Sequence, residues 1–260
     1  MSTRPTVTEI RASLAAARGA KLTRLLDELA IDDRLGVRAA CEAAVSRTRS
    51  SQLETKRTRG LYELERTLQA RGCTLVAGVD EVGRGALAGP LTAAAVVLPT
   101  RPRIEGLDAS KRLTPARREE LAEIIHATAI AVSIAHVSAS DIDGLGVTAA
   151  LKRAILHALA GLSCEPDHVV IDGLPLRVVE FETAVVKGDS KVAAIAAASI
   201  VAKVARDQLM RDLALSYPEY GFEVNKGYGT PEHVDTISRI GASVLHRRSF
   251  SVGGGTMSLF

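Results

Sequence analysis

The sequence predicts an α/β protein in which a mixed five-stranded sheet is flanked by helices and preceded by a small helical module. Three observations predict it. Residues 13–70 follow a helical pattern, the chain after Gly72 changes to short runs rich in Val, Ile and Ala, and helical stretches alternate with the last of these runs. Such alternation is typical of α/β domains, and 260 residues suffice for one large domain with an appendage.

The helical module comes first, and its apolar residues recur at three- and four-residue spacing. These residues are Leu22, Leu25, Leu26, Leu29, Leu61, Leu64 and Leu68. Between the two groups, the polar and basic stretch 46–60 predicts a loop, with phosphate contacts as an alternative. Residues 1–71 contain 14 Lys+Arg and 9 Asp+Glu, against 19 and 21 in the remainder. A basic module can hold a polyanion, although a solvated helical surface gives the same pattern.

Five apolar runs then predict the strands of the sheet. They lie at Leu75–Val79, Leu91–Leu98, Ile130–Val137, Val169–Ile171 and Ala184–Val186. The first three are close enough for an antiparallel meander, and the last two alternate with predicted helices over Val147–Leu162 and Lys191–Leu215. We therefore divide the chain into a basic helical N-terminal extension (1–71), an α/β domain (72–250) and a flexible C-terminal tail (251–260).

Composition excludes several classes of protein. Hydrophobic residues at 47% and charged residues at 24% are ordinary for a soluble globular protein. The longest strongly apolar stretch, Val192–Ala202, is too short to span a bilayer, so no membrane partner is expected. Cys41, Cys73 and Cys164 are widely separated and form no CxxC pair. These features predict a cytoplasmic protein without a disulfide framework.

Four acids follow three of the predicted strands. Asp80 and Glu81 come after the first run, Asp172 after the fourth and Asp189 after the fifth. The carboxyl ends of parallel strands gather at one edge of a sheet, and a buried carboxylate is costly without a cation, a basic partner or hydrogen bonds. Oxygen ligands at this density suit Mg²⁺ or Mn²⁺ rather than zinc. Each acid alone could cap a turn or a helix, but four at successive strand ends favour a metal site.

Two glycine-containing segments are further candidates for binding. Gly83–Arg84–Gly85 directly follows the first acids, and its glycines would let backbone approach a sugar or a phosphate. The segment 225–230 places Tyr228 among glycines and beside a lysine, which suits a stacking platform. Each has a structural alternative, a connecting turn for the first and a surface turn with a packed tyrosine for the second.

Residues 78–90, Gly-Val-Asp-Glu-Val-Gly-Arg-Gly-Ala-Leu-Ala-Gly-Pro, resemble the opening signature of the ribonuclease HII family. Further segments resemble that family in the same order, at 108–113, 170–173, 187–189, 196–207, 226–230 and 246–250. The basic head is similar to an extension found in some bacterial members. The resemblance implies an RNase H-like fold and a catalytic domain over residues 72–250. It also implies that Asp80, Glu81, Asp172 and Asp189 are metal-binding catalytic acids.

The activity implied by this resemblance is an endoribonuclease acting on the RNA strand of RNA/DNA hybrids and at single ribonucleotides in duplex DNA. Two divalent ions, Mg²⁺ or Mn²⁺, would activate water and stabilise the leaving oxygen, giving 5′-phosphate and 3′-hydroxyl ends. Gly83–Arg84–Gly85 would read the 2′-hydroxyl, and Tyr228 would stack near the following deoxyribose. Phosphate contacts are expected from Lys111, Ser199 and Lys203. The alternatives are a carboxylate-dependent exonuclease and a non-catalytic RNA/DNA-hybrid binding protein.

The C-terminal tail carries a candidate partner motif. A Gly-rich linker at 253–255 leads to two large apolar residues, Leu259 and Phe260, at the chain end. Residues 256–260 resemble the pentapeptide by which bacterial replication and repair proteins dock on the sliding clamp, with Thr256 where glutamine is usual. This likeness predicts weak clamp binding through Leu259 and Phe260; the alternative is a tail without a partner.

Overall fold

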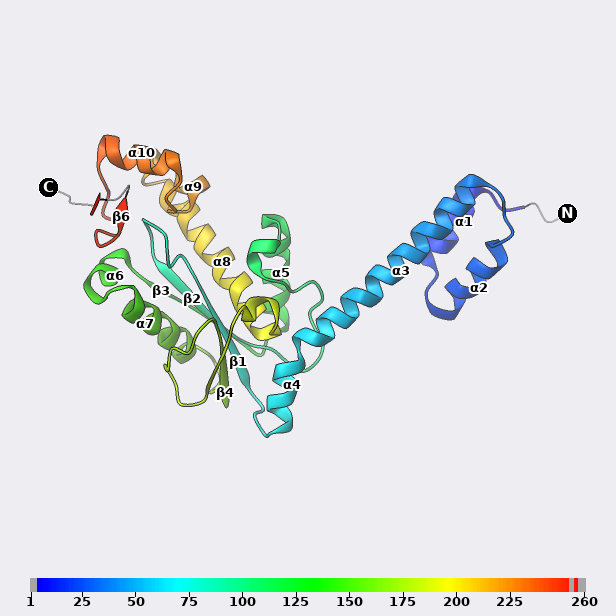
Figure 1. Cartoon of the computed structure of the whole chain (residues 1–260), viewed down its shortest axis with the longest axis horizontal. Helices are drawn as coiled ribbons and strands as arrows, with labels where there is room; N and C mark the ends of the chain where they lie inside the picture. Colours follow the sequence, from blue (N-terminus) through cyan, green and yellow to red (C-terminus); the bar gives the residue numbers. More distant parts are fainter. Residues whose placement is uncertain (1–3, 253–254, 257–260) are drawn as a thin grey trace. The chain divides into compact units, whose positions relative to one another are not determined.

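The computed structural model describes residues 4–252 and 255–256, and the chain divides into two compact units, Met1–Arg57 and Thr58–Phe260. The first unit contains α1 (Val7–Ala16), α2 (Gly19–Leu29) and most of α3 (Leu35–Leu61), drawn in blue in Figure 1. A capping box between Thr6 and Glu9 begins α1. Small and aliphatic residues of the three helices form their own core, so this part of the chain is the predicted helical module.

The predicted loop over residues 46–60 was wrong, because all of it lies within α3. The Thr48 and Thr55 hydroxyls donate to carbonyls four residues earlier, and Glu54 pairs with Arg57 at 2.7 Å. Straight-chain polar residues have good helix propensity, and the stretch contains no proline and no glycine before Gly60. Polarity alone therefore does not end a helix.

The second unit is built on the predicted mixed five-stranded sheet, in the order β3-β2-β1-β4-β5. Its strands are β1 (Val76–Val82), β2 (Leu91–Val97), β3 (Ala131–Val137), β4 (His168–Asp172) and β5 (Glu182–Val185). The first three form an antiparallel meander, and β4 and β5 run parallel to β1. Both arrangements confirm the sequence prediction.

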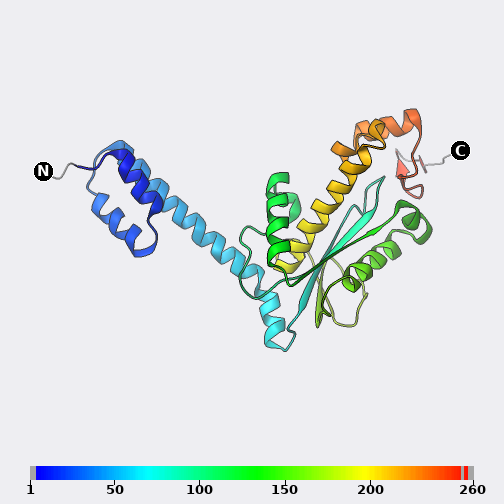
Figure 2. The same ribbon diagram turned by 180° about the vertical axis from the view of Figure 1, so that it is seen from behind.

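Helices cover the two faces of this sheet, as Figures 1 and 2 show from opposite sides. One face carries α5 (Pro115–Thr128) and α8 (Ala193–Ala214), and the other carries α6 (Ala139–Leu145) and α7 (Val147–Ala160). Alternating β2 residues divide between the two cores, with Ala94 and Val96 facing α8 and Ala95 facing α7. Among the described residues, the other α-helices of this unit are α4 (Glu63–Ala70), α9 (Phe222–Asn225) and α10 (Pro231–Ile240), and β6 (Ser251–Val252) pairs antiparallel with β7 (Gly255–Thr256).

Helix α8 lies unusually close to β1. A Cβ atom at Gly78 would stand 2.1 Å from the carbonyl carbon of Ala194, so only glycine fits there. Glu65 of α4 accepts a hydrogen bond from the Ala194 N–H at 2.9 Å and so caps a helix whose own N-cap residue, Val192, offers no side-chain bond. This packing fixes α8, which carries two of the predicted site residues, against the central strand.

The boundary between the compact units follows Arg57, whereas the sequence prediction placed it after residue 71. Leu61 and Tyr62 pack in the core beneath α8, and Leu68 packs against Val76 in a neighbouring cluster. Residues 58–71 therefore belong structurally to the α/β unit. Cys41, Cys73 and Cys164 are free, and no helix among the described residues is both long and apolar enough to cross a membrane.

Candidate active site

The predicted site residues lie together in one cleft of about 510 Å³. The cleft is lined by Asp80, Glu81, Gly83, Arg84, Gly85, Lys111, Asp172, Asp189, Ser199, Lys203 and Tyr228, and also by Val82 and Ser110. They come from β1, from the loop after it, from the 3₁₀ helix η1 (Ser110–Arg112), from the end of β4 and from η2 (Gly188–Ser190), α8 and the segment after α9. Segments far apart in the sequence therefore converge at one end of the sheet.

Strand geometry brings two of the acids to the same face. Gly78 of β1 pairs with Val170 of β4, and Asp80 and Asp172 each lie two residues farther along these parallel strands. Since side chains alternate at a period of two, both carboxylates share the face that Gly78 presents to α8. The strand β1 continues through Asp80 and Glu81 to Val82, beyond the predicted end at residue 79.

Asp189 reaches the cleft through a short turn after β5. Lys187 adopts a left-handed conformation with φ of +57°, and the chain then enters η2, which contains Asp189. The Gly188 N–H donates to Asp172 Oδ1 at 2.6 Å, so the carboxylate that ends β4 holds this turn in place. This hydrogen bond ties the turn after β5 to the end of β4.

Burial and repulsion from neighbouring carboxylates make Asp80, Glu81 and Asp189 hard to ionise. Desolvation, followed by the nearby charges of Glu81 and Asp172, raises the pKa of Asp80 to about 8, although a hydrogen bond from Ser199 acts in the opposite direction. Burial also raises the pKa of Glu81, even though Arg84 lies 3.9 Å away and lowers it. Desolvation and Asp172 raise the pKa of Asp189. Three carboxyls are therefore poorly compensated by the protein itself.

This chemistry fits a divalent cation. Hard carboxylate oxygens are the ligands of Mg²⁺ and Mn²⁺, and a bound cation would relieve the repulsion that raises these pKa values. As the side chains stand, no three His, Cys, Asp or Glu within 4–252 and 255–256 are close enough to hold one ion. The four acids share the cleft and its electrostatics, and their convergence on a metal remains a prediction.

The two glycines of the predicted loop differ in their surroundings. A Cβ at Gly83 would lie 2.2 Å from Arg206 Nε, and Gly83 has a φ of +82°. Nothing lies within 4 Å of the corresponding position at Gly85. The missing side chain of Gly83 therefore makes room for Arg206, whereas the position beside Gly85 is open; both glycines line the cleft, and the approach of their backbone to a sugar or a phosphate remains a prediction.

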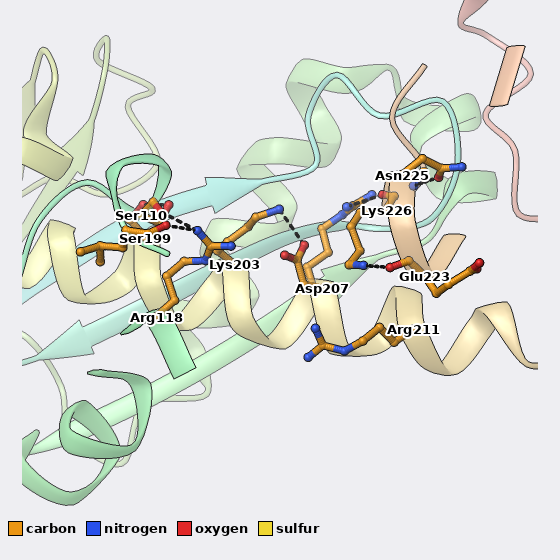
Figure 3. A network of polar contacts seen from close by, with 12 residues as sticks. Ser110, Arg118, Ser199, Lys203, Asp207, Arg211, Glu223, Asn225 and Lys226 are labelled. Carbon is orange, nitrogen blue, oxygen red and sulfur yellow. Dashed lines mark hydrogen bonds and ion pairs between the residues drawn. The ribbon is translucent and has the colours of Figure 1, made fainter. Parts of the chain in front are cut away.

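Polar residues continue from the cleft along α8 at four-residue spacing (Figure 3). Ser199 Oγ lies 2.8 Å from Ser110 Oγ, and Lys203 Nζ donates to Asp207 Oδ1 at 2.7 Å. Ser110 and Asp207 are 6% and 8% exposed, respectively, and neither was singled out from the sequence. Both fall inside segments that resemble the ribonuclease HII family, which was the signal that could have identified them.

Two cations lie close to the ring of Tyr228. Lys203 Nζ lies 5.8 Å from the centre of its ring, and the Arg206 guanidinium carbon lies 5.3 Å from it. The backbone just before the ring is fixed, because the Gly227 N–H donates to Asn225 Oδ1 at 2.7 Å. The structure thus places Tyr228 in the cleft, as predicted, while its stacking on a substrate remains a prediction.

Comparison with known proteins gives concordant results. Family profiles described as Ribonuclease HII and Ribonuclease HII N-terminal domain match residues 77–252 and 6–69, respectively. The Ribonuclease HII of Geobacillus thermodenitrificans is 43% identical over 246 residues, 95% of each chain. The solved ribonuclease H2 from Pyrococcus horikoshii OT3 aligns with a TM-score of 0.59 at 27% identity, covering 68% of this chain and 94% of that chain. The RNase HII of Archaeoglobus fulgidus, solved in a complex with PCNA, aligns with a TM-score of 0.58 at 26% identity, covering 70% of this chain and 98% of that chain.

Proposed function

Because the chain belongs to the ribonuclease HII family and is an RNase H-type endonuclease, we propose that Asp80, Glu81, Asp172 and Asp189 form its catalytic centre. The observation that carries the proposal is their shared cleft, in which burial and mutual repulsion raise the pKa values of Asp80 and Asp189. Its substrates are the RNA strand of RNA/DNA hybrids and single ribonucleotides embedded in duplex DNA. The family favours this activity over the exonuclease and the non-catalytic binding protein.

The four acids would hold two divalent ions, Mg²⁺ or Mn²⁺. Such ions, when bound, supply Lewis-acid activation of the phosphodiester and of the attacking water. Asp80 would be the innermost ligand because it is 7% exposed, whereas Glu81, Asp172 and Asp189 are only partly buried. Hydrolysis would break the bond between phosphorus and the 3′ oxygen, which leaves a 3′-hydroxyl on one product and a 5′-phosphate on the other.

The other cleft residues bind and orient the nucleic acid. Lys111 is exposed at the rim and Lys203 is partly buried on α8, so both can neutralise phosphates. Ser199 stays within hydrogen-bonding reach of Asp80 and orders the inner wall. Around Gly85 the open backbone lets a ribose approach, and the 2′-hydroxyl is the group that distinguishes RNA from DNA. Tyr228 offers its ring to the neighbouring deoxyribose.

Cleavage by an Asp172→Asn variant tests the catalytic centre. The substrate is a covalently closed circular duplex with one internal ribonucleotide, supplied with Mg²⁺ or Mn²⁺, which only an endonuclease can cut. We expect a loss of more than about 100-fold, since even outer partners of metal ligands cost about 10- to 100-fold. Asp235→Asn, at an exposed acid outside the cleft, is the matched control and should cut normally. Undiminished cleavage by Asp172→Asn would remove this acid from the mechanism.

The N-terminal unit is proposed to strengthen substrate binding. Residues 1–57 contain 11 Lys+Arg and 7 Asp+Glu, and none of residues 4–57 lines the cleft. An excess of cations outside the catalytic cleft can bind the duplex backbone and release counterions. The unit would therefore act on affinity and leave the chemistry unchanged.

A sliding clamp is the proposed protein partner. Leu259 and Phe260, which carry the proposal, lie outside the described residues. Support comes from the tail sequence and from the Archaeoglobus fulgidus relative, which was solved in a complex with PCNA. Calorimetric titration of a bacterial clamp should show micromolar binding that a Leu259→Ala/Phe260→Ala variant loses. Equal binding by both proteins would exclude this anchor.

A further inference from the structure

Two arginine side chains are completely buried beside the cleft. Arg206 on α8 and Arg247 in the segment after α10 are both 0% exposed. Within residues 4–252 and 255–256, no carboxylate lies at ion-pair distance from either guanidinium. Arginine is rarely buried without a carboxylate partner because desolvation of its charge is costly. Burial lowers the pKa of Arg247 to about 10, which leaves it protonated at neutral pH. These two cations require an explanation.

The hydrogen bonds that Arg206 donates go to main-chain carbonyls. Its Nε, Nη2 and Nη1 atoms donate to Pro90, Ala88 and Lys226, at 2.9, 3.1 and 2.8 Å. The first two carbonyls belong to the end of the glycine loop that begins at Gly83, and the third lies two residues before Tyr228. One side chain thus joins the two segments that are proposed to recognise the substrate.

Arg247 binds the same loop from another side. Its Nε and Nη2 atoms donate to the Gly89 carbonyl at 3.1 and 2.9 Å, and its Nη1 atom donates to the Arg84 carbonyl at 2.9 Å. The carbonyl of Arg84 belongs to the turn between the two loop glycines. Together the two guanidiniums therefore hold four carbonyls of residues 84–90, spanning the loop from its turn to its end.

Gly83 shows that the loop is shaped around Arg206. The missing side chain of Gly83 leaves the space in which Arg206 Nε lies, since an added Cβ would stand 2.2 Å from that atom. The other side of Arg206 faces the ring of Tyr228 at 5.3 Å. A lysine could not replace it, because a single ammonium cannot direct donors to three carbonyls in one plane and also present a flat face.

We propose that Arg206 and Arg247 are positioning residues for ribonucleotide recognition, which hold the loop 83–90 and the Tyr228 ring in register with each other beside the catalytic acids. The proposal rests on the proposed recognition roles of the loop and of Tyr228. Neither arginine lines the cleft, so both act through the residues that do. Discrimination between RNA and DNA then depends on the geometry that these buried cations impose.

The first experiment measures discrimination in the catalytically silent Asp172→Asn background. Binding to a duplex with one ribonucleotide is compared with binding to the same all-DNA duplex. Arg206→Lys and Arg247→Lys should each lower the ratio of the two affinities by about tenfold, because charge is kept while the hydrogen-bonded fork is lost. Ile155→Ala on α7, which opens a cavity in the opposite core, is the control for lost stability and should leave the ratio unchanged.

The second experiment is a double-mutant cycle on cleavage at a single ribonucleotide. If Arg206 acts through Tyr228, the combination Arg206→Lys/Tyr228→Ala should cleave about as slowly as the worse single variant. Multiplicative losses, or an affinity ratio unchanged in both arginine variants, would overturn the positioning role. Gly85→Ala and Tyr228→Ala distinguish failure of the proposed recognition from failure of the positioning role. If both variants discriminate RNA from DNA as well as the wild type, the loop and Tyr228 do not recognise the ribonucleotide. If both variants discriminate poorly but the arginine variants behave like Ile155→Ala, only the positioning role of the arginines is wrong.

Discussion

Replacement of Asp80 by asparagine tests whether the cleft is built for a cation. Asp80 is 7% exposed, and desolvation together with Glu81 and Asp172 raises its pKa from 3.8 to about 8. Below pH 8 the folded, metal-free protein therefore keeps a proton that the unfolded chain releases above about pH 4. Because the folded state binds more protons in this window, the stability contributed by this group falls as the pH rises from about 4 to 8.

The size of the effect follows from the same pKa values. Each pKa unit corresponds to about 1.4 kcal/mol, so the loss of folding stability caused by ionisation of Asp80 reaches about 5 to 6 kcal/mol at pH 8.5. At pH 5 the same reasoning gives about 1 to 2 kcal/mol. Asn has nearly the same shape but never ionises. Asp80→Asn should therefore raise the free energy of unfolding by these amounts while abolishing cleavage.

Urea denaturation in a chelator and in Mg²⁺, at pH 5 and 8.5, is the assay. At pH 8.5, Mg²⁺ at 100 times its dissociation constant should stabilise the wild type by about 2.7 kcal/mol and leave Asp80→Asn nearly unchanged. Glu65→Gln is the matched control, since burial raises the pKa of Glu65 to about 7 but Glu65 does not line the cleft. The free energy of unfolding of Glu65→Gln should rise by up to about 3 kcal/mol at pH 8.5. This variant should still be stabilised by Mg²⁺ and should still cleave its substrate.

Two results would refute this reasoning. If Asp80→Asn gains no stability at pH 8.5 in chelator, Asp80 is not held in an environment that opposes its charge. If Mg²⁺ stabilises the wild type and Asp80→Asn equally, a cation binds elsewhere and Asp80 is not its inner ligand. Either outcome would remove the electrostatic basis of the proposed metal centre.

Three further predictions concern separate parts of the chain. Tyr228→Phe should keep most cleavage at an RNA–DNA junction and Tyr228→Ala should lose about tenfold in kcat/KM, because the ring and not the hydroxyl stacks; equal rates would exclude stacking. Near pH 4, where Glu65 is largely protonated in both the folded and the unfolded state, Glu65→Ala should lower the unfolding free energy by about 1 kcal/mol or more, because the Ala194 N–H loses its acceptor; thermal unfolding that matches the wild type at that pH would contradict the cap. Deletion of residues 1–57, which spares the α/β core, should weaken duplex binding and flatten its salt dependence; an unchanged salt slope would make the unit structural.

The strands were predictable because each is a short run of β-branched and small residues bounded by polar ones. Their observed limits differ most at β1, where the run of apolar residues ends at Val79 but the strand continues to Val82. Asp80 and Glu81 keep their places in the ladder opposite Ala94 and Ala93. Acids are depleted in strands, so a propensity pattern ends too early at a strand whose last residues serve a site.

The cleft was predictable because its acids follow strand ends, and topology brings those ends together. The structural requirement for glycine at position 83 was not predictable, because the side chain that fills the space beside it belongs to Arg206, far along the chain. Sequence patterns identify arginines as exposed by default, and nothing local to Arg206 or Arg247 shows that their hydrogen-bond partners are carbonyls. Such partners depend on tertiary contacts between α8, the loop after β1 and the C-terminal segment.

The buried arginines of this unit do not form ion pairs with the acids of the cleft. Arg206 and Arg247 could neutralise the acids if they faced them, but their donors are used by carbonyls of the loop and of Lys226. Asp80 is consequently left with Ser199 as its main favourable side-chain contact and with two like charges nearby. An internal salt bridge would lower the pKa of Asp80 and remove the need for a cation. Because the two arginines instead hold the loop, the acids are left without an internal counter-charge, and this is the condition that the proposed divalent ions would relieve.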